Sequence, residues 1–366
     1  MNPAPPKRIA LMLESDGPGG AETMLMQLAE ELRRRGHHVV CVGPDHGCGW
    51  LGGELRRRGF TTDVFKLRQP IDRDCLRGMV EMLRRHQVEI VHSHEFTMAI
   101  YGAAAARRLG ITHVITMHGS EKVMARWQRR LALRLAFAAS RAVVAVSRAT
   151  HAHMAKVMRM APESILTIPN GIAFTPGFRP GVRAELGLTD SSVLVLAVGN
   201  LVPRKGHIFL LRALASLGTP DWHVAIAGRG DEEQRLLAFA AEAGIADRVH
   251  LLGHRGDIPD LLAAADIYAM PSLWEGLPMA LLEAMFAEKA IVASRASGIP
   301  EAIDEGKEGL LADPGDESQL SEALSKLITD PAVRARLGAN AKARAGRDFS
   351  SAVMTDAYER AFGIRD

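Results

Sequence analysis

The 366-residue sequence has few cysteines, few aromatic residues and no long hydrophobic run. Its three cysteines, Cys41, Cys48 and Cys75, form no C-x-x-C pair, and their odd number is typical of a reducing compartment rather than a disulfide framework. No run reaches the roughly 18 apolar residues of a membrane-spanning helix. Aromatic residues make up 5%, and no nucleic-acid-binding motif occurs, so nucleic acid is not an expected partner.

The N-terminus lacks the features of a secretion signal. Its apolar run ends at Glu14 and Asp16, and no small-residue cleavage site follows. We therefore expect a first strand here and a cytoplasmic protein. The length predicts two domains at about 100–200 residues each.

The net charge of +3 conceals an asymmetry between the two halves. Residues 1–172 contain 25 Lys+Arg and 15 Asp+Glu, so the rest contains 45 − 25 = 20 against 42 − 15 = 27. One half is thus at +10 and the other at −7. Such opposed charge suggests that only the first half meets an acidic surface.

Short apolar runs rich in β-branched residues alternate with segments of helical period, which predicts two doubly wound, Rossmann-like parallel α/β domains facing each other across a cleft. The strand candidates are 8–13, 38–43, 62–67, 89–94, 112–117 and 142–147, then 192–199, 223–228, 249–253, 266–270, 290–294 and 309–312. We expect domains at 1–172 and 173–345, and a C-terminal helix at 346–366 that packs back on the first. Ligands of such folds bind at the carboxyl ends of the strands.

Two loops after strands have the composition of phosphate sites. In 15–22, three glycines turn the chain into a helix, either for tight packing or for phosphate contact. In 198–207, Arg204 and Lys205 precede a helix, where two cations oppose the helix dipole unless an anion lies among them. A solvated basic pair is the alternative.

The segment 272–294 holds the most specific pattern, Glu275 and Glu283 eight residues apart. Glu283 lies in an apolar helix, so it either accepts hydrogen bonds from ligand hydroxyls or skirts the core; a ligand rich in hydroxyls explains the buried charge better. The G-x-G at 228–230 has Glu233 in place of a third glycine, which argues against a nicotinamide cofactor. The only D-x-D motif, at 72–74, follows Pro70 and is interpreted as a helix cap.

The sequence resembles the retaining glycosyltransferases of family 4, which have the GT-B fold. The resemblance covers nearly the whole chain and rests on ordered motifs: GGAE at 19–22, MHGS at 117–120, VAVS at 144–147, IPNGI at 168–172, RKG at 204–206, AGRGDEE at 227–233, EGLPMALLEA at 275–284 and SGIPEAI at 297–303.

The resemblance implies a nucleotide-sugar donor held mainly by the second half. Lys205 and Arg204 would face the diphosphate, Glu283 the ribose and Glu275 the sugar. Further donor contacts would come from Gly19, Gly20, His118, Gly276, Leu277 and Ser297. Two positions depart from the family pattern: Asn200 stands where an arginine is usual, and Ser297 where a glycine is common.

The implied chemistry needs no metal and no other cofactor, because lysine, arginine and helix N-termini can stabilise the leaving diphosphate. The acceptor attacks on the face from which the phosphate departs, so Glu275 is not a nucleophile. With His118, Lys205 and Arg204 it forms the predicted catalytic set. We expect His92, His94 and Glu22 on the acceptor side.

The helix expected at 122–141 carries an apolar stripe, Met124, Trp127, Leu131, Leu135 and Ala138, among arginines. The stripe packs on the first sheet or lies on an anionic membrane, and both can hold at once if the stripe packs while the arginines face lipid or an anionic acceptor. The acceptor is expected to be a glycan or a lipid-linked molecule in bacterial cell-surface polysaccharide or glycolipid synthesis. A nucleotide-sugar 2-epimerase of the same fold and a non-catalytic nucleotide-sugar-binding protein are the alternatives.

Overall fold

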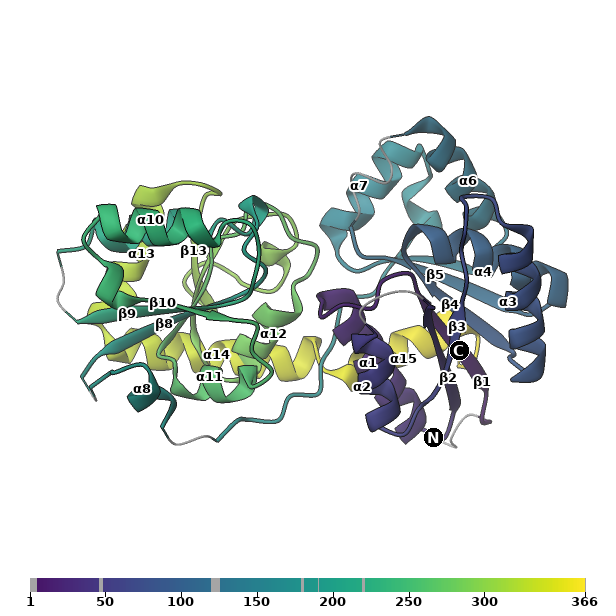
Figure 1. Cartoon of the computed structure of the whole chain (residues 1–366), viewed down its shortest axis with the longest axis horizontal. Helices are drawn as coiled ribbons and strands as arrows, with labels where there is room; N and C mark the ends of the chain where they lie inside the picture. The colour runs from purple at the N-terminus through teal and green to yellow at the C-terminus, as the bar shows by residue number, and fades with distance from the viewer. Residues whose placement is uncertain are drawn as a thin grey trace. The chain divides into compact units, whose positions relative to one another are not determined.

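The computed structural model describes residues 5–45, 49–119, 126–178, 181–189, 191–218 and 221–365. The chain forms two compact units. Unit 1 consists of Met1–Ile172 and Ser350–Asp366, and unit 2 of Ala173–Phe349. Each unit is a parallel sheet with helices on its faces (Figure 1). None of the described helices is long and apolar enough to cross a membrane.

Unit 1 contains a seven-stranded sheet in the order β3-β2-β1-β4-β5-β6-β7. The strands are β1 (Arg8–Leu13), β2 (His38–Pro44), β3 (Thr61–Phe65), β4 (Ile90–His94), β5 (Thr112–Met117), β6 (Ala142–Ala145) and β7 (Leu166–Thr167). Six correspond to predicted strands. The central ones, such as β1 and β4, are apolar runs buried on both faces, whereas the edge strand β3 is mostly half-buried or exposed. The two-residue β7 lacks such a run and was not predicted.

Among its described residues, unit 1 has the helices α1 (Gly20–Arg34), α2 (Trp50–Arg57), α3 (Arg73–Arg85), α4 (Glu95–Leu109), α6 (Trp127–Ala138), α7 (Arg148–Met158) and α15 (Ser351–Phe362). The Asp72 side chain accepts the backbone N–H groups of Asp74 and Cys75, each at 3.0 Å. Asp72 is therefore the N-cap of α3, and the interpretation of the D-x-D motif as a cap is confirmed.

Unit 2 repeats the design with the order β10-β9-β8-β11-β12-β13. Its strands are β8 (Val193–Val198), β9 (Trp222–Ala227), β10 (Val249–Gly253), β11 (Ile267–Met270), β12 (Ala290–Ser294) and β13 (Gly309–Ala312). Its helices are α8 (Val182–Glu185), α9 (His207–Ala215), α10 (Glu233–Glu242), α11 (Ile258–Ala264), α12 (Met279–Phe286), α13 (Glu317–Thr329) and α14 (Pro331–Asp348).

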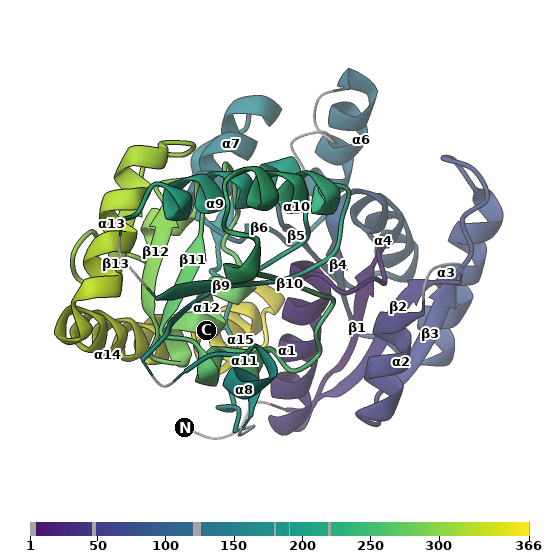
Figure 2. The same ribbon diagram turned by 60° about the vertical axis from the view of Figure 1, so that its left-hand side comes forward.

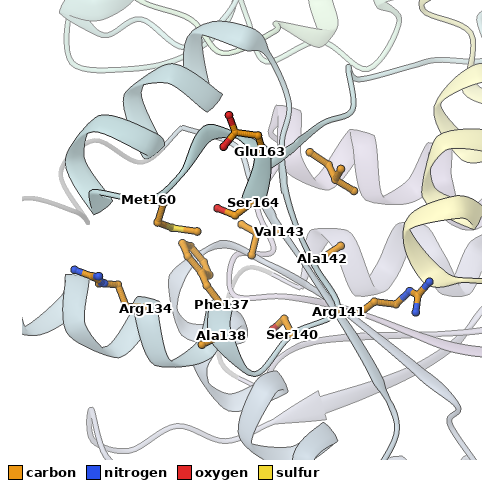
Figure 3. Close-up of a pocket in the computed structure, with 11 residues that line it drawn as sticks. Arg134, Phe137, Ala138, Ser140, Arg141, Ala142, Val143, Met160, Glu163 and Ser164 are labelled. Atoms are coloured by element: carbon orange, nitrogen blue, oxygen red, sulfur yellow. The ribbon is translucent and has the colours of Figure 1, made fainter.

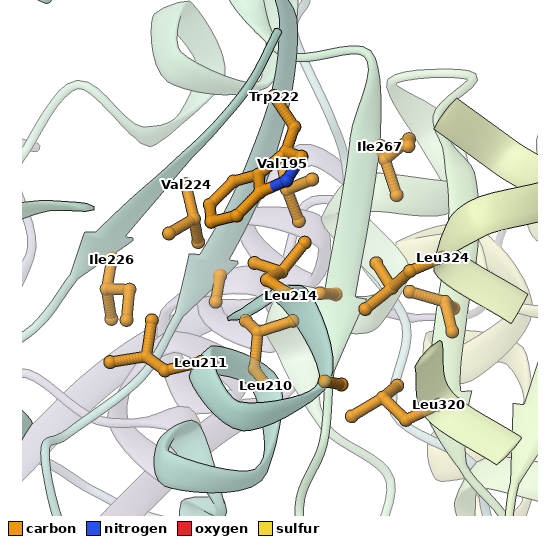
Figure 4. Close-up of a cluster of buried hydrophobic side chains, with 14 of the residues drawn as sticks. Val195, Leu210, Leu211, Leu214, Trp222, Val224, Ile226, Ile267, Leu320 and Leu324 are labelled. Carbon is orange, nitrogen blue, oxygen red and sulfur yellow. The ribbon is translucent and has the colours of Figure 1, made fainter. Parts of the chain in front are cut away.

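One core of unit 2 packs side chains of α9 and α13 against one face of the sheet (Figure 4). Trp222 of β9 is 1% exposed and lies among leucines such as Leu210, Leu214 and Leu324. This packing holds β8 and β11 in the middle of the sheet, so the loops after them start from a rigid base.

The helix α15 returns to unit 1 and lies beside α1 (Figures 1 and 2). Its fully buried Glu359 accepts hydrogen bonds from Arg35 Nη1 at 2.8 Å and lies 3.0 Å from His37 Nε2. The helix begins at Ser351 rather than at 346, because α14 continues to Asp348.

In both sheets the strand order reverses direction beside the first strand of the unit, between β1 and β4 and between β8 and β11. The predicted Rossmann-like α/β class is therefore confirmed in each unit. Ligands of doubly wound sheets bind beyond the strand ends at such reversal points. The loops after these four strands are the first place to look for a site.

Candidate functional site

In unit 2, Lys205 and Glu275 form an ion pair beyond the ends of neighbouring strands. Lys205 follows β8 and Glu275 follows β11, so strand pairing brings together residues far apart in sequence. Lys205 Nζ donates to Glu275 Oε1 at 2.6 Å, and Ser272 Oγ donates to the same oxygen at 2.8 Å. Glu275 is only 5% exposed, so the pair is a largely desolvated cluster.

Arg204 stands beside this pair with its side chain about half exposed. Its Nη1 donates to the Trp274 carbonyl at 3.3 Å and lies 3.9 Å from Glu275 Oε2. Asn200, at the position where the family has an arginine, is exposed on the same loop. Arg204 is thus the arginine on this loop that lies beside the cluster.

The loop after β8 and the loop after β11 touch at Gly206. Its φ is +67°, and a Cβ there would lie 2.1 Å from the Pro271 carbonyl oxygen. Only glycine allows both the left-handed conformation and this approach. The RKG sequence therefore places Lys205 against the β11 loop by local geometry.

Glu283 lies in the second turn of α12 in a mostly apolar environment. Burial raises the pKa of its carboxyl to about 7. No hydrogen-bond donor to it occurs among the described residues. The helix starts after the buried Gly276 and Leu277 with no side-chain cap. A neutral or unsatisfied carboxyl beside an uncapped helix start suits a ligand with hydroxyl donors and negative charge.

Ser297 follows β12 with a φ of +45°, a conformation that glycine adopts without strain. The next residue, Gly298, donates its backbone N–H to the Glu275 carbonyl at 3.2 Å. The turn is thus bound to the loop of Glu275, and its positive φ explains why the family commonly has glycine at position 297.

In unit 1, His118 lies at the end of β5 next to the end of β4. Its Nε2 is 2.9 Å from His94 Nδ1, and its backbone N–H donates to Glu95 Oε1 at 2.9 Å. Burial lowers the pKa of His118 to about 4, so the ring is neutral at physiological pH.

The histidines predicted on the acceptor side are both fully buried. His92 Nε2 lies 2.8 Å from Thr116 Oγ1, and the ring packs on Tyr358 at 4.8 Å between centroids. His94 contacts His92 and His118. Neither ring is exposed in this structure, because strand β4 is covered on both faces, and their place on the acceptor side stays a prediction.

Gly19, Gly20 and Glu22 form the start of α1. Gly19 is the N-cap and Gly20 the first helical residue. Glu22 is 5% exposed, and its side chain lies over Gly19. A Cβ at position 19 would lie 2.5 Å from Glu22 Oε2. Burial raises the pKa of Glu22. The glycine at 19 therefore makes room for the Glu22 carboxyl as well as for the turn.

Several neighbours of these residues were not identified from the sequence. Ser272 contacts Glu275, Glu95 contacts His118, and Glu14 accepts the Thr97 backbone N–H at 2.6 Å. All lie just after a strand, at the same sheet edges as the predicted residues. Their position after predicted strands could therefore have identified them from the sequence.

A pocket of about 550 Å³ lies at the other side of the unit 1 sheet, near the starts of β6 and β7 (Figure 3). Phe137 and Met160 form its centre, and Arg134 of α6 borders it. Because it is remote from the strand carboxyl ends, it is not part of the candidate site.

The apolar stripe on α6 is exposed. Trp127, Leu131 and Leu135 are 64%, 53% and 67% exposed, whereas Leu133 and Phe137 on the opposite face are buried. The interpretation that this stripe packs on the sheet is therefore wrong: the helix buries its other face. Met124, at the start of the stripe, lies outside the described residues.

Comparison with known proteins gives matches along both units. The chain matches the family profile "Glycosyltransferase Family 4" over residues 18–175 and "Glycosyl transferases group 1" over residues 179–344. A GDP-mannose-dependent alpha-(1-6)-phosphatidylinositol monomannoside mannosyltransferase of Mycolicibacterium smegmatis is 32% identical over 364 residues, which cover 90% of this chain and 91% of that protein.

A UDP-Gal:alpha-D-GlcNAc-diphosphoundecaprenol alpha-1,3-galactosyltransferase of Escherichia coli is 28% identical over 279 residues, 71% of each chain. Among solved structures, Anabaena HepE in complex with UDP is similar with a TM-score of 0.84 at 24% identity, covering 97% of this chain and 99% of that one.

The two Rossmann-like units and the similarity to solved structures show the GT-B fold, and the family matches show a glycosyltransferase. The chain belongs to glycosyltransferase family 4, group 1.

Proposed function

We propose that the protein is a retaining hexosyltransferase that moves a sugar from a nucleoside diphosphate sugar to a glycan or lipid-linked acceptor. The bond between the sugar C1 and the phosphate oxygen breaks, and a bond from an acceptor oxygen to C1 forms on the same face. The acceptor proton passes to the leaving phosphate.

The observation that carries this proposal is the buried cluster of Lys205, Glu275 and Ser272 at the reversal point of the unit 2 sheet. The ammonium group of Lys205 is bound by one carboxylate in the free protein. A bound diphosphate carries more negative charge than that carboxylate, so the ammonium group can leave Glu275 and pair with the diphosphate. Arg204 beside it is exposed and adds a second cation. Glu275 is then free to contact the sugar.

Glu283 supports a nucleoside rather than a bare phosphate as the ligand. Its carboxyl lacks a donor among the described residues and has a pKa raised to about 7. Ribose supplies neighbouring hydroxyl donors of the kind that such a carboxyl requires. The main chain of Gly276 and Leu277, the Asn200 side chain and the Ser297 hydroxyl would complete the donor contacts.

We propose that the reaction needs no divalent metal. Lys205, Arg204 and the start of α12 would stabilise the charge that develops on the leaving diphosphate. Turnover should therefore persist in excess EDTA. Loss of turnover in EDTA with recovery on adding magnesium would contradict this proposal.

A thermal-shift panel of UDP-, GDP- and ADP-sugars tests the function and identifies the base, because a ligand stabilises the protein that binds it. The stabilising donor is then incubated with the enzyme alone. Slow release of free sugar and nucleoside diphosphate supports a transferase. Epimerised donor would support the epimerase alternative, and tight binding without either product would support a binding protein.

For the acceptor we propose a lipid-linked molecule in cell-surface glycolipid or polysaccharide synthesis, met at the inner face of the membrane. The names of the two relatives above both include lipid acceptors. The exposed stripe of α6 is the second support. Trp127, Leu131 and Leu135 would enter the lipid, and Arg134 on the same helix would meet anionic headgroups.

Liposome flotation with and without anionic lipid tests the membrane contact. The protein should float with anionic vesicles at low salt, and Leu131→Asp should abolish this. Leu237→Asp, at a leucine of α10 that is 48% exposed, is the matched control and should float normally. Equal flotation of the two variants would rule out α6 as the membrane surface.

A further inference from the structure

The junction between β4 and α4 holds His118 at two points. His94, the last residue of β4, lies with its Nδ1 2.9 Å from His118 Nε2. Glu95, the next residue, accepts the His118 backbone N–H at 2.9 Å. Its φ is +64°, which is strained for a residue with a side chain and persists only where the surroundings require it. The junction is thus shaped to fix both the ring and the backbone of His118.

The ring–ring hydrogen bond requires one histidine to donate and the other to accept. Burial lowers the pKa of both rings, so both are neutral and each has a single N–H. Two arrangements are possible. Either His94 donates from Nδ1 and His118 carries its proton on Nδ1, or His118 donates from Nε2 and His94 carries its proton on Nε2.

The second nitrogen of His94 distinguishes the two arrangements. His94 Nε2 is buried and has no hydrogen-bond partner among the described residues. If His118 donated, this nitrogen would be a buried N–H without an acceptor. If His94 donates, it is a bare acceptor. Orphaned buried N–H groups are the rarer of the two in folded proteins. The geometry therefore favours His94 as the donor.

We propose that His94 is a positioning residue that fixes His118 as the tautomer with its proton on Nδ1. In this form His118 offers a hydrogen-bond donor to an oxygen of the bound sugar and cannot take a proton at that nitrogen. The proposal rests on the proposed role of His118 at the sugar. It assigns His118 to binding and orientation rather than to general base catalysis.

Nitrogen-15 NMR of the ring nitrogens tests the tautomer on the free, full-length protein. His118→Ala identifies the His118 signals. We expect Nδ1 of His118 to be protonated and Nε2 unprotonated in the wild type, and this preference to be lost in His94→Leu. His113 is also buried but does not contact His118. In the control variant His113→Asn, the preference of His118 for a proton on Nδ1 should therefore remain. A proton on Nε2 of His118 in the wild type would overturn the proposal, whatever the activity of the enzyme.

Turnover with the stabilising nucleotide sugar tests the positioning role. His94→Leu should lower kcat roughly tenfold to a hundredfold, the usual effect of removing a partner that orients a histidine, with little change in donor KM. His94→Asn places an amide donor near Nδ1 and should restore most of the loss. The double variant with His118→Ala should be no slower than His118→Ala alone.

The two measurements separate the possible failures. Two results would show that His94 has only a structural role and that the proposal is wrong. In one, the losses of His94→Leu and His118→Ala add up in the double variant; in the other, His94→Asn folds but does not restore kcat. If His118→Ala kept full turnover, the proposed role of His118 in the reaction would be wrong, and the positioning role with it, even with the predicted tautomer.

Discussion

Titration of Glu283 should make donor binding depend on pH near neutrality. Its carboxyl has a pKa raised from 4.5 to about 7 by burial in the free protein. Hydroxyl groups that donate to a carboxylate favour the ionised form, so donor binding should return the pKa toward its ordinary value. The donor therefore binds better as pH rises through 7.

The size of the effect follows from the ionised fraction of the free protein. With a pKa of about 7, Glu283 is about 9% ionised at pH 6 and about 91% at pH 8. The affinity should then rise about tenfold between these pH values, or about 1.4 kcal/mol. A nucleotide sugar is the right probe, because a nucleoside diphosphate has a terminal phosphate that itself titrates near pH 6.

Isothermal titration calorimetry at pH 6, 7 and 8 measures the effect, with Glu283→Gln as the matched control. The variant keeps the shape of the side chain but cannot ionise, so its affinity should be low and nearly independent of pH. It should also be more stable than the wild type at pH 8 by at most about 3 kcal/mol, because the buried charge is gone. Equal pH profiles for the two proteins would refute a ribose contact at Glu283.

Three further outcomes are expected. Glu275→Gln should lose at least about a hundredfold in kcat per folded molecule, a far larger loss in turnover than in stability, because its proposed role is at the reacting sugar; an unstable variant with normal specific activity would contradict this. Ser297→Gly should melt no lower than the wild type, because glycine relieves the positive φ, whereas Ser297→Ala should not be stabilised. Glu359→Gln should lower stability by about 1.5–3 kcal/mol, because Arg35 loses one charged buried partner while it keeps Glu31 and Asp356; an unchanged denaturant midpoint would contradict it.

The sheet of each unit could be predicted from the sequence because its central strands are continuous apolar runs covered on both faces. The run at 290–294 corresponds residue for residue to β12. The last helix was misplaced because α14 and α15 are separated by a two-residue break at 349–350, and no glycine or proline marks it. The signal that was missed is Ser350, the N-cap of α15, whose Oγ accepts the Val353 backbone N–H at 3.3 Å.

The candidate site was predictable where residues lie directly after strands, as Lys205 and Glu275 do, since strand ends of one sheet converge. Side-chain direction was not predictable. The face of α6 that carries Trp127 has an apolar period typical of a packed helix, yet the sheet takes the other face. The burial of His92 was not predictable either. It depends on α15, a helix far away in the sequence, whose Tyr358 packs on the His92 ring.

The proposed role of Lys205 in holding the donor diphosphate is tested most directly by calorimetric titration of the full chain with UDP, GDP and ADP in EDTA. One of these nucleotides should bind the wild type, and Lys205→Ala should weaken that binding by about tenfold or more, the effect of losing a charge-assisted contact of about 1.5–3 kcal/mol. A folded Lys205→Ala protein that binds the nucleotide as tightly as the wild type would contradict the placement of the diphosphate at this cluster.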